Sequence, residues 1–113
     1  MSKLRNRVTL IGNLGSNPEI NTFESGKKKA SFTLATNDYY KNNEGEKIQD
    51  TQWHNVIAWN HQADLIERYV SKGQEIAVEG KLATRSYEDK TGVTRYVTEI
   101  ILQELLLLNS SGQ

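Results

Sequence analysis

The stretch Trp53-His54-Asn55-Val56-Ile57-Ala58-Trp59 contains both tryptophans of this 113-residue chain. Successive side chains of a β-strand point to opposite faces, so this pattern puts both tryptophans on one face and Val56 and Ala58 on the other. Val56 and Ala58 suit a core, which leaves the tryptophan face toward solvent. Two flat aromatic rings on an exposed strand are typical of a surface that binds bases or sugars. The alternative is a pair of core tryptophans, because aromatic side chains dominate many cores.

Length and composition limit the class of protein. A chain of this length forms one domain with its own core, and the absence of cysteine excludes disulfides and thiolate metal sites. Lys plus Arg and Asp plus Glu both number 14, so the net charge is zero. Nucleic-acid binders are usually basic, so that function requires a segregated basic surface. No apolar run near the N-terminus is long enough for a signal peptide or a membrane span, and we expect a cytoplasmic protein without membrane contact.

The remaining pattern predicts short strands, polar turns and one helix. Polar loops are expected between the first two strands and over Asn37–Asp50. The helix is expected over His61–Lys72, with Asn60 as its N-cap and Gly73 as its stop signal. The expected strands are 8–14, 30–36, 53–59, about 75–87 and 93–108.

The last strand is apolar on both faces at Ile100–Leu102 and again at Leu105–Leu108. Burial on both sides in so small a domain indicates a subunit contact, and the alternative is a simple core. We expect one domain over residues 1–108 and a polar, disordered end over residues 109–113.

Three strands, a helix and two further strands are the element order of the OB-fold. The predicted class is therefore all-β with one short helix: a five-stranded Greek-key barrel with the helix between strands 3 and 4. Proteins with this fold bind oligonucleotides or oligosaccharides on one face of the barrel and its loops.

An ordered set of motifs resembles the bacterial single-stranded DNA-binding protein family, in register from about Leu4 to Leu108. The motifs are Leu10-Ile11-Gly12-Asn13-Leu14-Gly15, Phe32-Thr33-Leu34-Ala35-Thr36, Trp53-His54, Tyr69-Val70-Ser71-Lys72-Gly73, Glu79-Gly80-Lys81-Leu82 and Arg95-Tyr96-Val97-Thr98-Glu99. The resemblance implies a bacterial, nucleoid-associated homotetramer that binds single-stranded DNA without sequence preference in replication, recombination and repair.

The resemblance also implies where this chain would hold DNA. Bases would stack on four aromatic residues: Tyr40, Trp53, Trp59 and Tyr87. Two family tryptophans appear as Tyr40 and Tyr87, a family phenylalanine appears as Trp59, and each ring still offers a π-face. We expect backbone or polar contacts from Lys29, Lys41, Asn55, Lys72, Lys81, Arg85 and Arg95, where Asn55 replaces a residue that is often basic in the family.

Subunit contacts are expected from strand 1 and the last strand. The residues are Val8, Leu10, His54, Ile100 and Leu102, with a homotetramer as the expected state and a dimer as the fallback. Full-length family members continue to an acidic tip that recruits other enzymes. This sequence stops at Gln113, so we do not expect tail-mediated partners.

Enzymatic motifs are weak in this sequence. Gly12-Asn13-Leu14-Gly15 matches neither a phosphate-binding loop nor a dinucleotide fingerprint, and His54 and His61 lack metal-ligand spacing. We expect no enzyme activity, no catalytic residue, no cofactor and no metal site. Two other hypotheses stay open: an oligosaccharide-binding module, and a protein-interaction module in which Trp53 and Trp59 lie in an interface.

Overall fold

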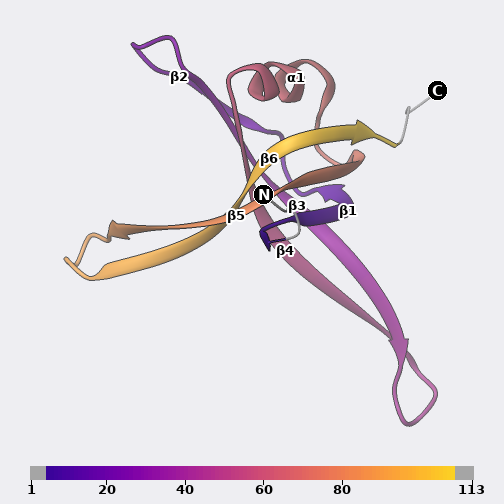
Figure 1. Cartoon of the computed structure of the whole chain (residues 1–113). Coiled ribbons are helices and arrows are strands. Elements are labelled where there is room, and N and C mark those ends of the chain that lie inside the picture. Colours follow the sequence, from indigo (N-terminus) through magenta and orange to yellow (C-terminus); the bar gives the residue numbers. More distant parts are fainter. Residues whose placement is uncertain (1–4, 109–113) are drawn as a thin grey trace.

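The computed structural model describes residues 5–108, which form a twisted barrel with two long hairpin arms and one helix at a barrel end (Figure 1). The elements in chain order are β1 (Val8–Leu14), β2 (Glu19–Thr22), β3 (Lys28–Lys41), β4 (Lys47–Trp59), α1 (His61–Tyr69), β5 (Glu75–Glu88) and β6 (Thr94–Leu107). Within the described residues, α1 is too short to cross a bilayer, and no other helix is long and apolar enough to do so.

The strand order is β1-β5-β6-β4-β3-β2, and β1 also pairs with β3. This second pairing closes β1, β5, β6, β4 and β3 into a five-stranded barrel, with α1 between the third and fourth barrel strands. The predicted OB-fold is therefore confirmed. The short strand β2 lies in the predicted polar loop and adds to the outer edge of β3.

Two short seams close the barrel. One is the antiparallel pairing of β1 with β3, at Asn13–Ala35 and Leu14–Leu34. The strands approach so closely there that a Cβ atom on Gly12 would lie 2.2 Å from the carbonyl oxygen of Ala35, so only glycine fits without movement. The other seam is parallel and joins β4 to β6 at Val56–Ile100 and Ile57–Ile101.

The core lies inside the barrel and under α1. Ala63 and Ile66 of α1, with Val70 just after it, close this barrel end. The most deeply buried large side chains are Leu34, Val56, Ile66, Ile76 and Val78. Burial of each side chain of this size stabilises the fold by about 1.5–3 kcal/mol.

A register change in β6 alters which of its positions face the core. Glu79 pairs with Glu104 while Gly80 pairs with Leu102, so Gln103 has no partner in the ladder. The inward face therefore switches from even to odd positions at Gln103, and Leu105 packs against the core. The Nε2 group of Gln62 donates a hydrogen bond of 2.9 Å to the carbonyl oxygen of Gln103.

The burial of two residues of β6 corrects part of the predicted subunit interface. Ile100 and Leu102 are 3% and 4% exposed and belong to the barrel core, so their side chains are not available to a partner surface. The outward positions Ile101 and Leu106 are apolar as well, so the bulge accounts for only part of the apolar run.

The predicted loop over Asn37–Asp50 is wrong for most of its length. β3 continues to Lys41 and β4 begins at Lys47, so this segment is a β-hairpin arm with a tight turn at Asn42–Glu46. Both faces of the arm are mostly polar and exposed, which removes the apolar alternation that normally indicates a strand. β5 and β6 form a second arm (Figure 1).

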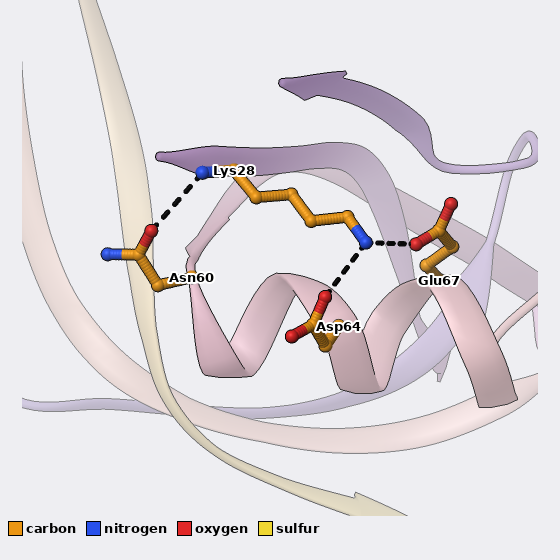
Figure 2. A network of polar contacts seen from close by, with 4 residues as sticks. All are labelled: Lys28, Asn60, Asp64 and Glu67. Atoms are coloured by element: carbon orange, nitrogen blue, oxygen red, sulfur yellow. Dashed lines mark hydrogen bonds and ion pairs between the residues drawn. The ribbon is translucent and has the colours of Figure 1, made fainter. Parts of the chain in front are cut away.

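The start of α1 differs from the expected cap. Asn60 has the left-handed φ of 53° and makes no side-chain cap hydrogen bond. Its Oδ1 atom instead accepts a bond of 3.2 Å from the backbone N–H of Lys28, whose ammonium group contacts Asp64, at 2.8 Å, and Glu67 (Figure 2). The hydrogen bond from Lys28 is the main cause that lowers the pKa of Asp64, and these contacts fix α1 to the beginning of β3.

The end of α1 also comes earlier than predicted. The helix stops at Tyr69, because Val70 takes an extended backbone conformation and buries its side chain in the core. Gly73, with φ of 85°, turns the chain toward β5 instead of ending the helix.

Candidate nucleic-acid interface

The outward face of β3 and β4 carries both tryptophans. Directly opposed residues of an antiparallel pair share a face, and the pairs on this face are Ala35–Trp53, Thr33–Asn55, Ser31–Ile57 and Lys29–Trp59. Trp53 is 61% exposed and Trp59 is 37% exposed. Such exposure contradicts the alternative that these tryptophans form the core of the single chain.

Trp53 lies against the chain segment that follows β1. A Cβ atom on Gly15 would lie 2.4 Å from the indole ring of Trp53, so the ring can occupy this position only because residue 15 is glycine. The indole therefore packs closely on the chain at Gly15 while Trp53 stays more than half exposed.

Trp59 has aromatic and cationic neighbours. The ring of Phe23 stacks on it with centroids 6.3 Å apart and an interplanar angle of 30°. The Nζ atom of Lys29 lies 5.9 Å from the Trp59 ring centroid. Phe23 was not predicted as a site residue. Its signal in the sequence is weak: it is an aromatic residue in a polar segment, just before the Ser25-Gly26 turn.

A polar groove of about 440 Å³ follows the same face. Asn55 and Ile57 line it and lie between the two tryptophans along β4. Its other lining residues are Ser16, Asn17, Glu19, Lys29, Ser31, Phe32, Thr33, Val56, Arg85 and Glu99. Ser31, Thr33 and Asn55 contribute small hydroxyl and amide side chains to its lining.

Arg85 forms a bidentate ion pair in this groove. Its Nε and Nη2 atoms donate to the two carboxylate oxygens of Glu99, both at 3.1 Å, and Glu99 is only 8% exposed. These hydrogen bonds, together with the charge of Glu99, raise the pKa of Arg85. The predicted DNA contact Arg85 is therefore in the groove, but it is paired with the carboxylate of Glu99, a pairing that was not predicted.

Tyr87 and Arg95 lie opposite each other on the β5–β6 arm. Tyr87 is two residues after Arg85 on β5, so all three side chains lie on the same face of the arm. Tyr87 is 48% exposed. The Nε atom of Arg95 donates to Asp89 at 2.9 Å, so this cation is also paired. Hydrogen bonds from Arg95 and Thr91 lower the pKa of Asp89 to about 2.

The predicted lysines differ from these arginines. Across residues 5–108, no carboxylate lies within ion-pair distance of Lys29, Lys41, Lys72 or Lys81. Lys81 lies on the Arg85 face of β5, and the backbone N–H of Lys72 donates to Asn17 beside the groove. These four charges are therefore unpaired within the described residues and available to an anionic ligand.

Tyr40 is the predicted aromatic residue that the structure separates from the others. It pairs with Ile48, at an even position of the ladder, so it lies on the face of the β3–β4 arm opposite to Trp53. It is 55% exposed.

Three other predicted interface residues are near the barrel surface. Val8 and Leu10 are partly buried against the core, and the Nε2 atom of His54 lies 3.0 Å from the hydroxyl oxygen of Thr36. An apolar strip also crosses three strands at the adjoining residues Ile11, Ala77 and Leu106, of which Ile11 and Leu106 are exposed and Ala77 is partly buried. In the described part of the chain, no group of three His, Cys, Asp or Glu residues could hold a metal ion.

Comparisons with known proteins agree with this geometry. The model of the single-strand binding protein family matches residues 5–108. The single-stranded DNA-binding protein of Bacteroides thetaiotaomicron is 42% identical over 109 residues, which cover 95% of this chain and 68% of that protein. Single-stranded DNA-binding protein 1 of Chlorobaculum tepidum is 40% identical over 111 residues, covering 97% of this chain and 68% of the relative.

A solved structure has the same fold. The Plasmodium falciparum SSB complex with ssDNA superposes with a TM-score of 0.83 at 35% identity, over 92% of this chain and 95% of that chain. The family match spans the barrel, both arms and the groove. This chain therefore belongs to the single-strand binding protein family.

Proposed function

We propose that this protein binds and protects single-stranded DNA without sequence preference, in replication, recombination and repair. The observation that carries the proposal is the pair of exposed tryptophans, Trp53 and Trp59, on the same face of β4 as Asn55 and Ile57, which line a polar groove. The family relatives support it, because they are named for single-stranded DNA binding.

The proposed mechanism combines stacking with charge. Every base has a π-face, so stacking on Trp53, Trp59 and Tyr87 is insensitive to sequence and contributes about 1–3 kcal/mol per base. Lys29 and Lys81 hold the phosphates, with Lys41 and Lys72 at the edges of the path. Duplex DNA binds poorly because its bases are already stacked on each other.

Two predicted contacts take different roles in this proposal. Asn55 lines the groove and offers hydrogen bonds rather than a charge. Tyr40 lies on the far face of the β3–β4 arm, so it contacts only a strand that wraps around that arm.

The binding protein acts passively in this proposal, without catalysing a reaction, in the cytoplasm where the nucleoid lies. We also propose that it assembles as a homotetramer, with a dimer as the minimum. The apolar strip of Ile11, Ala77 and Leu106 supports assembly, because a second copy would cover it.

Titration of intrinsic fluorescence with oligothymidylate tests the proposal. Stacking on Trp53 and Trp59 should quench the emission strongly, and Trp53→Ala should weaken binding by about 1–3 kcal/mol without loss of the fold. Tyr96→Ala is the matched control, since Tyr96 is 74% exposed on the face of β6 opposite to Arg95.

Two results would contradict the proposal. Unchanged emission at saturating oligothymidylate would exclude stacking. Affinity that does not fall with salt would point to a neutral ligand such as a sugar, because phosphate binding releases counterions.

A further inference from the structure

The β3–β4 arm has two faces of different chemistry. One face is formed by odd positions, with the registered pairs Asn37–Thr51, Tyr39–Gln49 and Lys41–Lys47. The other face is formed by even positions, with the registered pairs Thr36–Gln52, Asp38–Asp50 and Tyr40–Ile48. We call these the Tyr39 face and the Tyr40 face.

The Tyr39 face continues the surface that carries the tryptophans. Trp53 pairs with Ala35, and both belong to the same odd series as Tyr39 and Gln49. Gln49 lies four residues from Trp53 along β4, which is about 13 Å, whereas Trp59 lies six residues the other way, about 20 Å. Tyr39 therefore extends a row of rings that already contains Trp59 and Trp53.

Side-chain contacts hold this face in place. The hydroxyl group of Thr51 donates to the Oδ1 atom of Asn37 at 2.6 Å, and the Nε2 group of Gln49 donates to the same atom at 3.0 Å. The Nζ atom of Lys47 lies 4.6 Å from the centroid of the Tyr39 ring. Tyr39 still exposes 57% of its surface. The solvent-exposed ring of Tyr39 therefore has the cation of Lys47 beside it.

The charges on the two faces are opposite in sign. Lys41 and Lys47 lie directly across from each other next to Tyr39. Asp38 and Asp50 lie directly across from each other next to Tyr40. A phosphate backbone is attracted to the first pair and repelled by the second.

From this arrangement we propose that Tyr39 is a further stacking residue, which with Lys41 and Lys47 guides single-stranded DNA along the Tyr39 face of the arm. The inference rests on the proposed function. It adds to that function one contact residue, Tyr39, and the face of the arm along which the DNA lies. Tyr40 then meets only DNA that is long enough to pass around the arm.

Binding of a short oligothymidylate to the full chain tests this path. A strand of about 12 nucleotides falls within the range of about 4–16 nucleotides that one OB-fold holds. Tyr39→Ala should weaken its binding by about 5- to 150-fold, the loss of one base stack. Tyr39→Phe keeps the ring and should bind as the wild type does. Lys47→Gln should flatten the slope of log affinity against log salt by about 0.7.

Tyr40→Ala is the matched variant, since the two tyrosines are adjacent and equally exposed. It should leave the affinity for the short strand unchanged. Circular dichroism of each variant checks that the barrel is intact.

The outcomes separate the inference from the proposed function. If the wild type binds, Trp53→Ala weakens binding and Tyr39→Ala has no effect, the inference is wrong and the proposed function stands. A loss in Tyr40→Ala as large as that in Tyr39→Ala also overturns the inference. If the wild type does not bind oligothymidylate, the proposed function itself fails.

Discussion

At the scale of single residues, Glu99 controls how much of the charge of Arg85 can reach DNA. The buried carboxylate of Glu99 accepts hydrogen bonds from both the Nε and the Nη2 atoms of the Arg85 guanidinium group. A phosphate approaching Arg85 must therefore share it with Glu99, unlike a phosphate approaching Lys81.

Replacing Glu99 by Gln keeps the shape of the side chain and removes its charge. The freed charge of Arg85 should strengthen binding at low salt and steepen the slope of log affinity against log salt by up to about 0.7. Lys81→Ala provides the opposite comparison, because it removes an unpaired cation and should flatten the slope by about 0.7. A Glu99→Gln protein with the wild-type slope would show that Arg85 does not contact the backbone.

The sequence could predict some of these residues and not others. Alternation in one strand was sufficient to put Trp53 and Trp59 on a shared outward face. The pairing of Arg85 with Glu99 depends on the register between β5 and β6, and the stack of Phe23 on Trp59 depends on where a turn folds back. Neither can be obtained from spacing along one strand.

At the scale of elements, the turn of the β5–β6 arm is organised by Asp89. Its Oδ1 atom accepts hydrogen bonds from the backbone N–H groups of Thr91 and Val93, and its Oδ2 atom accepts from Arg95. These bonds favour the ionised carboxylate and so depress its pKa from 3.8 to about 2.

The pH dependence of this turn follows from that shift. A depressed pKa means that the carboxylate stabilises the folded turn fully above about pH 3.8, and that the contribution is lost as the pH falls through about 2. Amide chemical shifts of Thr91 and Val93 should titrate with a midpoint near pH 2, and Asp89→Asn should abolish this transition. A midpoint at the ordinary value of an aspartate would contradict the hydrogen-bonded turn.

Elements were predicted well where one face is buried and poorly where neither is. Apolar alternation identified β1, the barrel part of β3 and β4, and the helix. It failed on the β3–β4 arm, because solvent lies on both sides and no apolar period develops. It could not locate the change of inward face at Gln103, because a bulge in β6 shifts the register there.

At the scale of the whole molecule, the apolar strip of Ile11, Ala77 and Leu106 predicts self-association. Leu106 is 61% exposed, and a charge there would be costly only if a second copy covers it. Light scattering should give a mass of four times 12.8 kDa for a tetramer, or two times 12.8 kDa for a dimer, and Leu106→Glu should reduce the mass by breaking the interface that covers the strip. Leu82→Glu serves as the control, because Leu82 is 48% exposed but lies outside the strip. A wild-type mass of one chain at micromolar concentration would exclude the assembly.

The two seams of the barrel have a consequence for how the chain reaches its native state. The β3–β4 and β5–β6 hairpins pair residues that are close in sequence, and such local pairs form quickly because little loop entropy is lost. The seams join distant residues through only two pairs each, Asn13–Ala35 with Leu14–Leu34 and Val56–Ile100 with Ile57–Ile101. We therefore expect two preformed hairpins to dock late in folding, so that substitutions at the seams change the folding rate less than the unfolding rate.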